Sequence, residues 1–490
     1  MSGVTTQHPL YKARECLRRR IRDCLGGTDR VKSRGKLYLP LPDPLCNSEK
    51  DQRYLDYLYR SYYVNLPQKT VVSLRGLVMR KSPNIELVPR LEYLEDDADG
   101  NGTDLVQMIA SALDESCSLG NFGLLARQPL AEEGITRSNE GQFMPRISMY
   151  CEEQVVNWRV TNGKLTMVVL LEAVEQAKDG DMFETVVGAR YRVYYLNEQG
   201  QVVEDVYTGK NKTQVIAEFY GDDYYSGKVG VSDDWTVTST TFAERDEIPF
   251  IFCGSIDNLP GLDPAPIENI CEFALKMYMV SADEMENLHQ ACGGVLTIAS
   301  KLNETEWEEL NGDTKINVNF GAVHLGESGS MNYVQATEST MVSSTMTRLM
   351  DMAIAQGAQI IMPDRADATA TEARINQGAS LSQLGQIVQN VSQAFTWIAN
   401  KCAEMVNAPT ENKISLNDEF FFEKMTPDEM RAWYEGVMKS MVTQKDFNIA
   451  MRKGGLLAEH RTDEEIESEL EEQKLEGGGD GVVTGFDNQQ

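Results

Sequence analysis

The sequence predicts an α+β protein, in which long amphipathic helices are separated along the chain from a region of short strands. Between Thr371 and Met405, apolar residues recur at alternating steps of three and four, which places them in one stripe on a helix roughly 50 Å long. From about Gly123 to Phe252 the pattern changes to short alternating runs separated by turn residues. A second apolar seam follows between Ile267 and Leu288. Helices and strands in different stretches of one chain are typical of α+β folds.

Length, composition and charge limit the classes of protein to consider. A chain of 490 residues is long enough for two to four domains of about 100 to 200 residues each, and an apolar content of 41% permits a core. The net charge is −29, from 75 acidic and 46 basic residues. Such a chain is poorly suited to grip nucleic acid through its phosphates, because that requires clustered Lys and Arg. A protein past which DNA slides is compatible with this charge.

The residues that usually carry chemistry are scattered. The nine cysteines are odd in number and never spaced as Cys-x-x-Cys, so we expect neither a disulfide framework nor a zinc site. The four histidines lie far apart, and we expect a structural role for His289 near a helix end. Motifs for nucleotide binding, serine hydrolases and zinc proteases do not occur. We therefore expect no catalytic residues, metal or cofactor. With no apolar leader or membrane-length run, we expect a soluble protein that does not contact a membrane.

The N-terminal region is predicted to be helical. Residues 1–35 read as one helix that ends at Gly26-Gly27 and carries a basic cluster, Lys12, Arg14, Arg18, Arg19, Arg20 and Arg22. The favoured interpretation is a solvated helix face that pairs with acidic neighbours, and the alternative is a nucleic-acid patch. A helix with an aromatic stripe follows, and the stripe is interpreted as packing: Tyr54, Leu55, Leu58, Tyr59, Tyr62 and Tyr63. A further helix is predicted from Thr70 to Val78.

The stretch from Asp97 to Gly102 resembles the first half of a calcium-binding loop. The pattern fails at its twelfth position, which is Met108 where a bidentate glutamate is required. A tight turn followed by a helix, with Asp104 or Thr103 as its N-cap, explains the same residues better.

Six strands are predicted in the β-rich region, with hairpin turns at Thr161-Asn162-Gly163-Lys164 and Asn197-Glu198-Gln199-Gly200. The predicted strands are Ile147–Tyr150, Val155–Val160, Leu165–Glu172, Ala189–Leu196, Val202–Tyr207 and Trp235–Phe242.

The order of elements after residue 264 is the most informative pattern. A helix beginning at Ala265-Pro266 is followed by a small αβ insert with short strands at Val295–Ile298, Lys315–Phe320 and Met331–Val334. A helix from about Glu338 to Gln356, a short loop, and a long helix with a capping box at Thr369-Ala370-Thr371-Glu372 come next. A strand at Lys413–Glu423 and helices at Pro427–Met441, Thr443–Lys453 and Glu464–Lys474 complete the predicted elements. The tail from Glu476 is expected to be disordered.

This order, with several motifs, resembles the portal proteins of tailed bacteriophages, the head-to-tail connector family. The resemblance covers roughly residues 8–460, and the motif that opens the long helix is its most specific part. The motifs are His8-Pro9, Tyr38-Leu39-Pro40, Asp99-Gly100-Asn101-Gly102, Asn157-Trp158-Arg159, Ala282-Asp283 to Leu288-His289 and Thr369-Ala370-Thr371-Glu372-Ala373.

The resemblance implies a portal-type fold with a β-rich wing, a helical stem, a small αβ clip, a long spanning helix and a short helical crown. The implied parts are wing 1–263, stem helix 264–291, clip 292–336, stem helix 337–357, tunnel loop 358–368, wing helix and strand 369–425, crown 426–475 and tail 476–490. It places Gln359, Met362, Pro363, Asp364 and Arg365 in the tunnel loop. It places Lys301, Lys315, His324 and Glu327 in the clip.

The function implied by the resemblance is a ring at one capsid vertex, expected to be a dodecamer, through which double-stranded DNA is packaged and ejected without sequence recognition. Implied partners are the terminase large subunit, a head-tail adaptor, and the major capsid and scaffolding proteins. The implied location is the virion, after assembly in the host cytoplasm. We also expect the seams of the stem helices to pack against neighbouring subunits. The alternatives are an α+β hydrolase using carboxylates such as Asp364 and Glu372, and another head-tail adaptor ring.

Overall fold

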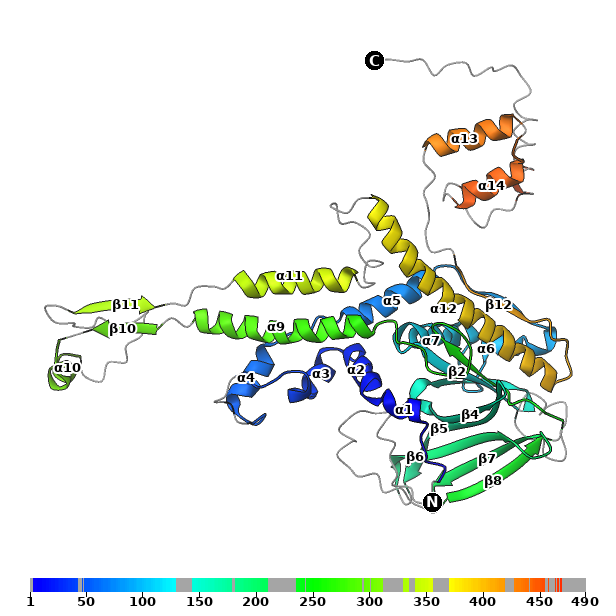
Figure 1. The fold of residues 1–490 in the computed structure, drawn as a ribbon, viewed down its shortest axis with the longest axis horizontal. Helices are drawn as coiled ribbons and strands as arrows, with labels where there is room; N and C mark the ends of the chain where they lie inside the picture. Colours follow the sequence, from blue (N-terminus) through cyan, green and yellow to red (C-terminus); the bar gives the residue numbers. More distant parts are fainter. Residues whose placement is uncertain are drawn as a thin grey trace. The chain divides into compact units, whose positions relative to one another are not determined.

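The computed structural model confirms the α+β class and divides the chain into two compact units, residues 1–418 and 419–490 (Figure 1). The structure describes residues 3–42, 46, 48–128, 143–178, 181–209, 235–242, 244–292, 295–299, 301–311, 329–334, 340–355, 370–418, 427–439 and 441–453, with residues 457, 463, 465, 466 and 468. The predicted tail lies outside the described residues.

The N-terminal region forms three short helices, so the prediction of one helix ending at Gly26-Gly27 was wrong. The helices are α1 (Pro9–Ala13), α2 (Glu15–Leu25) and α3 (Gly27–Ser33). The predicted break at Gly26-Gly27 is confirmed for α2, but the chain returns to a helix at once. Gly27 has a φ of 84°, a left-handed conformation that glycine adopts without steric cost.

His8 and Trp158, which belong to two motifs far apart in sequence, lie side by side. The His8 side chain accepts a hydrogen bond from the backbone N–H of Leu10 and so caps α1. Its ring stacks on Trp158 with centroids 3.9 Å apart. The Asn157 amide donates to the Thr6 carbonyl at 2.9 Å. These contacts attach the N-terminal segment to the β-rich region.

The helices after residue 50 lie near the predicted positions, but α4 ends at Arg60, so Tyr62 and Tyr63 of the predicted stripe are not helical. In the aromatic stripe, Tyr54 and Tyr63 are buried, whereas Leu55 and Tyr59 are exposed and do not pack as expected. Asp104 is the N-cap of α7 and accepts a hydrogen bond from the Gln107 backbone N–H at 2.6 Å, which confirms the predicted cap. The elements are α4 (Gln52–Arg60), α5 (Leu66–Val78), the 3₁₀ turn η2 (Pro89–Leu91), α6 (Tyr93–Asp96) and α7 (Leu105–Ser118).

The first unit contains a three-stranded antiparallel sheet with the strand order β3-β2-β9. Its strands are β2 (Asn121–Arg127), β3 (Arg146–Cys151) and β9 (Phe250–Gly254). Gly123 lies where the ring of Phe250 crosses β2, and a Cβ at this position would meet the ring. A glycine is therefore required for the close approach of the two strands.

A five-stranded antiparallel sheet has the order β4-β5-β6-β7-β8. All six predicted strands are present, because Ile147–Tyr150 forms part of β3 and the other five form this sheet. Asn162 and Gly163, with φ of 52° and 76°, form the predicted turn between β4 and β5. Buried Trp158, Tyr194 and Phe252 belong to the core shared by the two sheets. The strands are β4 (Val155–Thr161), β5 (Lys164–Lys178), β6 (Asp181–Leu196), β7 (Val202–Gly209) and β8 (Trp235–Phe242). β5 and β6 are much longer than predicted.

The elements after residue 264 follow the predicted order. They are α9 (Glu268–Cys292), β10 (Val295–Ala299), α10 (Glu304–Asn311), β11 (Ser330–Val334), α11 (Thr340–Ala355) and α12 (Ala370–Met405). The predicted strand Lys315–Phe320 lies outside the described residues.

α12 is the central helix of the first unit, because it packs against α7 and the three-stranded sheet (Figure 1). Its predicted stripe is confirmed where side chains are described: Val391, Phe395, Ile398 and Cys402 are fully buried. A short strand β12 (Lys413–Ser415) then pairs with β1 (Asn84–Glu86). The strand was predicted to run from Lys413 to Glu423, but Leu416–Asp418 are not in a strand. Residues 419–423 lie outside the described part.

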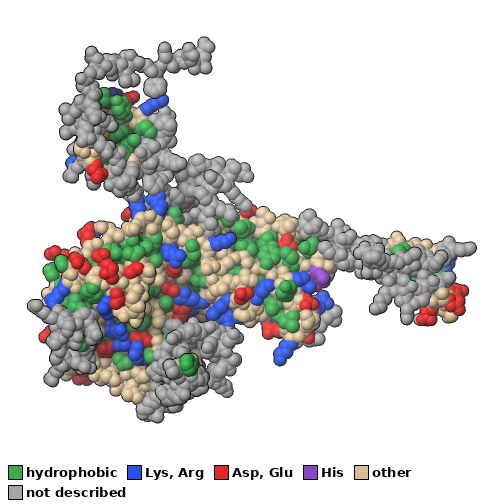
Figure 2. Space-filling view, turned by 180° about the vertical axis from the view of Figure 1, so that it is seen from behind, with side chains coloured by type: hydrophobic (Ala, Val, Ile, Leu, Met, Phe, Trp, Pro, Cys, Tyr) green, Lys and Arg blue, Asp and Glu red, His purple; other side chains and the backbone are tan. Residues whose placement is uncertain are grey.

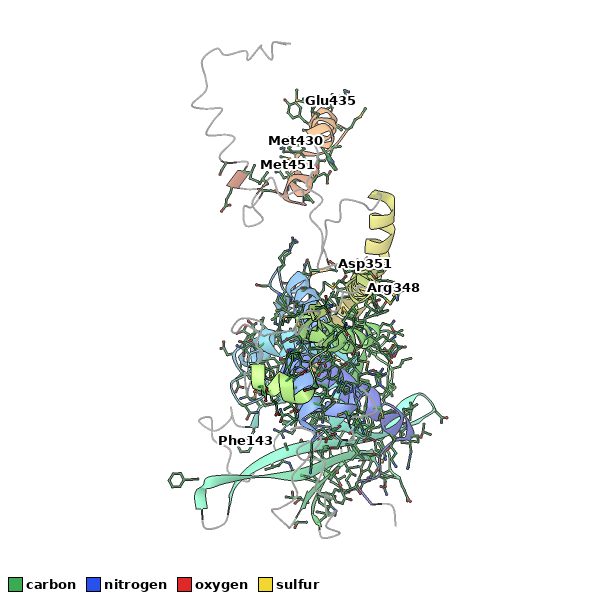
Figure 3. The ribbon with its side chains drawn as sticks, turned by 90° about the vertical axis from the view of Figure 1, so that its left-hand side faces the viewer. Phe143, Arg348, Asp351, Met430, Glu435 and Met451 are labelled. Carbon is green, nitrogen blue, oxygen red and sulfur yellow. The ribbon has the colours of Figure 1, made fainter. Side chains whose placement is uncertain are left out.

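The second unit contains α13 (Pro427–Met438) and α14 (Gln444–Lys453), which pack against each other. Met430 and Met451, one from each helix, are half-buried (Figure 3). The predicted helix from Pro427 ends at Met438 rather than Met441. Of the predicted helix Glu464–Lys474, only residues 465, 466 and 468 are described, and they are helical.

Candidate functional site

The element with the clearest functional design is a helical hairpin formed by α9 and α11, with β10, α10 and β11 between them in sequence. α9 is 25 residues and α11 is 16 residues, so they are roughly 37 Å and 24 Å long. The two helices pack side by side (Figure 1). Ala353 of α11 is fully buried, whereas Met341 is 74% exposed. α11 is therefore covered on one side only.

The seam of α9 is buried within the chain along most of its length. Cys271, Ala274 and Tyr278 are fully buried, and α9 packs against α2, α4 and α5. The ring edge of Tyr63 meets Tyr278 at a centroid distance of 6.2 Å. The expectation that this seam packs against a neighbouring subunit was wrong from Ile267 to Ser281, because helices of the same chain already cover it. Only the last part, around Leu288, is exposed.

Polar contacts fix the middle of α9 to α4 and the segment that follows α4. Tyr57 donates to Asp283 Oδ1 at 2.6 Å, and Tyr62 donates to Glu284 Oε2 at 2.9 Å. Arg60 forms an ion pair with Glu286. Burial, together with the hydrogen bond to Glu284, raises the pKa of Tyr62 to about 12, so its hydroxyl remains a donor over the physiological pH range. Three ties within one turn of α9 hold the helix rigidly at this point.

The tip of the hairpin is a small antiparallel ribbon with an acidic helix. Val295 pairs with Val334, and Ala299 with Ser330. α10 begins with a reciprocal cap, in which the Glu306 N–H donates to Asn303 Oδ1 at 2.9 Å and the Asn303 N–H donates to Glu306 Oε2 at 3.0 Å. Acidic side chains gather here (Figure 2), and Glu306, Glu308 and Glu309 are exposed.

The predicted site residues fall mostly outside the described part of the chain. Of the four clip residues, Lys301 is described and is exposed, whereas Lys315, His324 and Glu327 are not described. The tunnel-loop residues Gln359, Met362, Pro363, Asp364 and Arg365 also lie outside the described residues. α11 ends at Ala355 and α12 begins at Ala370, so residues 358–368 lie between these two helices in sequence, and their assignment to a tunnel loop stays a prediction. Arg348 and Asp351 are charged residues in the last turns of α11, the helix that precedes these residues in sequence (Figure 3).

The N-terminal basic cluster is an internal ion network. Arg14 and Arg18 pair with Glu152 at 3.0 and 3.4 Å, and Arg22 pairs with Glu115 and Glu153 at 2.7 and 2.6 Å. Burial raises the pKa of Glu115. Burial also acts to raise the pKa of Glu153, but the Arg22 guanidinium outweighs it and holds that pKa below the usual value. Pairing with acidic neighbours is thus confirmed for Arg14, Arg18 and Arg22, although their side chains are shielded rather than solvated.

A second ion network lies inside the five-stranded sheet. Glu172 on β5 accepts hydrogen bonds from Arg192 Nε at 2.8 Å, Arg190 Nε at 2.7 Å and the Tyr150 hydroxyl at 2.7 Å. Burial acts to raise the pKa of Glu172, but Arg192 outweighs burial and lowers it to about 2. Arg192 also pairs with Glu204. These carboxylates are neutralised by arginines, so they stabilise the sheet and are not poised for acid-base chemistry.

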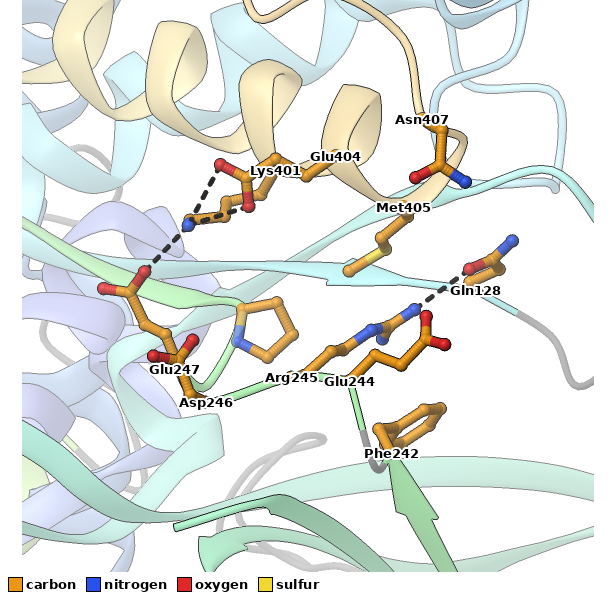
Figure 4. Close-up of a pocket in the computed structure, with 11 residues that line it drawn as sticks. Gln128, Phe242, Glu244, Arg245, Asp246, Glu247, Lys401, Glu404, Met405 and Asn407 are labelled. Atoms are coloured by element: carbon orange, nitrogen blue, oxygen red, sulfur yellow. Dashed lines mark hydrogen bonds and ion pairs between the residues drawn. The ribbon is translucent and has the colours of Figure 1, made fainter.

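A pocket of about 450 Å³ lies between the end of α12 and the segment that joins β8 to β9 (Figure 4). Lys401 pairs with Glu247 at 2.7 Å and with Glu404 at 2.9 Å. Arg245 stacks on Phe242 at 4.5 Å and donates to Gln128 Oε1 at 2.9 Å, and burial lowers its pKa. No sequence motif predicted this pocket, because its lining comes from three segments that are distant in the chain.

The predicted turn at Asp97 is a hydrogen-bonded loop. Asp97 Oδ1 accepts from the backbone N–H of Gly100 at 2.8 Å and of Gly102 at 3.0 Å. Asp99 Oδ1 accepts from the N–H of Asn101 at 2.8 Å. The carboxylates therefore stabilise the turn itself. Within the described ranges, no cluster of three or more His, Cys, Asp or Glu has the geometry of a metal site. The helices described also include none with the length and hydropathy of a membrane span.

Comparisons with known proteins give one family and several structures. A family model described as a domain of unknown function, DUF4055, matches residues 266–404, which run from just before α9 almost to the end of α12. No curated protein matches the sequence. One similar solved chain comes from the neck of an empty GTA particle computed with C6 symmetry. It is 12% identical, the match covers 80% of this chain and 90% of that chain, and the TM-score is 0.39.

Two further chains are similar at the same identity of 12%. One is from the virion of a native gene transfer agent (GTA) particle, with 87% of this chain and 99% of that chain covered and a TM-score of 0.37. The other is from the neck of a native GTA particle computed with C12 symmetry, with 79% and 89% covered and a TM-score of 0.36. Each match extends over most of both chains at low sequence identity.

Proposed function

We propose that this chain is the subunit of a portal-type ring through which double-stranded DNA passes. The observation that carries the proposal is the hairpin of α9 and α11, fixed at one end to the helices and sheets of the same chain and carrying a small ribbon with α10 between its helices. α9 and α11 would be the stem, residues 292–336 the clip, 358–368 the tunnel loop, α12 the wing helix, and α13 with α14 the crown.

The charge of the chain fits a channel better than a clamp. Each subunit carries −29, and Glu306, Glu308 and Glu309 of α10 are exposed. Acidic walls around a hole repel phosphates from every side, so DNA remains centred and mobile, whereas basic walls would hold it. Three arginines of the basic cluster, Arg14, Arg18 and Arg22, are engaged with Glu115, Glu152 and Glu153 and are not available to grip phosphates. DNA would therefore pass without sequence recognition.

The proposal assigns partners to the parts of the chain. The clip, with Lys301, Lys315, His324 and Glu327, would contact the terminase large subunit during packaging and then a head-tail adaptor. The wing would contact the major capsid and scaffolding proteins. Gln359, Met362, Pro363, Asp364 and Arg365 would lie at the narrowest part of the channel. The assembled ring, expected to be a dodecamer, would form in the host cytoplasm and remain in the virion.

Negative-stain electron microscopy and mass photometry of the purified full chain test the proposal. We expect closed rings with a central hole and a mass that is a fixed multiple of 54.8 kDa. A protein that remains monomeric at all salt concentrations, with no rings in the images, would refute it. Substitutions at Pro363 to Ala366 provide a second test, because they should impair DNA packaging and leave ring assembly intact.

A further inference from the structure

The outer edge of β8 is open in the described part of the chain. β8 is the last strand of the five-stranded sheet and pairs with β7 alone, from Trp235 opposite Gly209 to Phe242 opposite Val202. An unpaired strand edge presents a row of backbone N–H and C=O groups that can pair with another strand. Eight residues of edge are long enough for a full strand to be added.

β8 also lacks the features by which natural proteins usually protect an edge. Its sequence, Trp-Thr-Val-Thr-Ser-Thr-Thr-Phe, contains no charged residue and no proline. Thr236, Val237, Thr238 and Ser239 are all exposed, so neither face of this stretch is covered by described residues. A β-branched, uncharged and exposed edge favours strand addition.

The opposite kind of feature, a projecting ribbon, lies in the middle of the same sheet. Among the described residues, β5 and β6 pair only with each other from Ala173 opposite Ala189 to Lys178 opposite Asp181, because β4 and β7 end before this stretch. We call residues 173–189 the arm. Figure 3 shows its two strands running out beyond the rest of the sheet. Its six residues on β5 reach about 20 Å, and a two-stranded ribbon is only marginally stable in water.

The root of the arm is rigid. Glu172, the residue before the arm, is held by Arg190 and Arg192 in the ion network of the sheet. Tyr191 packs edge-on against Trp235, the first residue of β8, with ring centroids 5.4 Å apart. At the other end of the arm, Phe183 is 88% exposed. A fixed root and an exposed tip describe an element positioned to contact another molecule.

We propose that the arm of one copy adds to the outer edge of β8 in the next copy, and this inference rests on the proposed ring. Arm and β8 are different surfaces, so their contact is head-to-tail, the kind that closes into rings. Charge favours this pairing over others. The arm carries Glu175, Asp179, Asp181 and Glu184 against a single Lys178, so two arms repel each other, whereas β8 is uncharged. Each copy thus supplies one arm that can be added to a sheet and one β8 edge that can receive an arm.

Photo-cross-linking identifies what the arm touches. Phe183 is replaced with p-benzoylphenylalanine, which keeps an aromatic side chain at the tip, and copies labelled with ¹⁴N and ¹⁵N are mixed before irradiation. We expect cross-linked peptides that join the arm of one isotope to residues 235–242 of the other. Cross-links that map to a different surface, or that join the arm only to its own copy, would overturn the inference.

Two variants test the strand edge itself. Val237→Lys places a charge on the β8 edge, and Val160→Lys is the matched control, because Val160 is a similarly exposed valine on β4 at the other edge of the sheet. In an arm-deletion variant, Val174 is joined to Gly188 by Asn-Gly, since these two residues are paired and a two-residue turn can close them. We expect the first and third variants to weaken self-association at least about tenfold, and the control to leave it unchanged.

Hydrogen exchange of residues 235–242 separates the remaining outcomes. Slow exchange in the isolated monomer at the β8 amides that do not face β7 would mean that the edge is already covered within one chain, and would overturn the inference. Rings that form with no cross-link to β8 would overturn it while leaving the portal proposal standing. Cross-linked open chains without rings would support arm docking and count against the portal. A protein that never associates would overturn both.

Discussion

Replacing Glu172 with glutamine should destabilise the five-stranded sheet at neutral pH and much less in acid. Glu172 accepts four hydrogen bonds and holds two arginines at the point where β5 leaves the sheet. Burial acts to raise the pKa of its carboxyl, but Arg192 outweighs burial and lowers the pKa from 4.5 to about 2. At 1.36 kcal/mol per pKa unit, this difference corresponds to roughly 3 kcal/mol of stability.

The sign of the pH dependence follows from the lowered pKa. The stabilisation is fully present above about pH 4.5, where the unfolded chain is also ionised, and is lost as the pH falls toward 2. Because glutamine does not titrate here, E172Q should lose roughly 3 kcal/mol relative to the natural chain at pH 7, and the gap should narrow at pH 3.

The stability difference between E172Q and the natural chain is measured by urea unfolding at both pH values. A short hydrogen-exchange pulse at one common pH then reports the unfolding locally, in peptides from β5 and β6. The control is Glu198→Gln, an exposed carboxylate on the turn of the same sheet, which should have little effect. A gap of equal size at pH 7 and pH 3 would show that Glu172 acts by packing and would refute the electrostatic reasoning.

Three further substitutions test the fold. Phe395→Ala should cost about 3–5 kcal/mol because the ring is fully buried under α12, and thermal unfolding should show a large loss that the exposed control Gln393→Ala does not. Asp104→Ala should cost about 1 kcal/mol and speed hydrogen exchange in the first turn of α7, while Asp104→Asn should retain most of the cap; equal losses would argue against capping. Gly123→Ala should cost about 1–3 kcal/mol in urea unfolding, with partial recovery when Phe250 is also changed to Leu; no recovery would mean that the strain lies elsewhere.

Local signals were enough to predict much of the fold. The α12 stripe, the Asn162-Gly163 turn and the Asp104 cap depend on residues close in sequence, so periodicity and turn chemistry identify them. The outer halves of β5 and β6 were missed, because a ribbon with no third strand buries little and leaves no clear alternation. The pairing of β2 between β3 and β9 is non-local, and no pattern within one strand specifies it.

In the candidate site, too, local features were predicted from the sequence and non-local contacts were not. The seam on α9 predicted correctly that one face is buried, but periodicity cannot say against what, and the cover came from α2, α4 and α5 of the same chain. The partners of Arg14, Arg18 and Arg22 lie about 90 to 140 residues away, so their charge alone left two interpretations open. The tunnel-loop and clip assignments come from the resemblance and stay predictions.

The burial of the α9 seam within its own chain has a consequence for the order of events in the cell. A helix whose apolar face is already covered does not need a neighbour in order to fold, so a single copy can reach its final shape soon after synthesis. Association would then bring together finished parts, and its extent would depend on protomer concentration rather than on the folding rate. A pool of folded monomers could accumulate and be recruited when a particle begins to form.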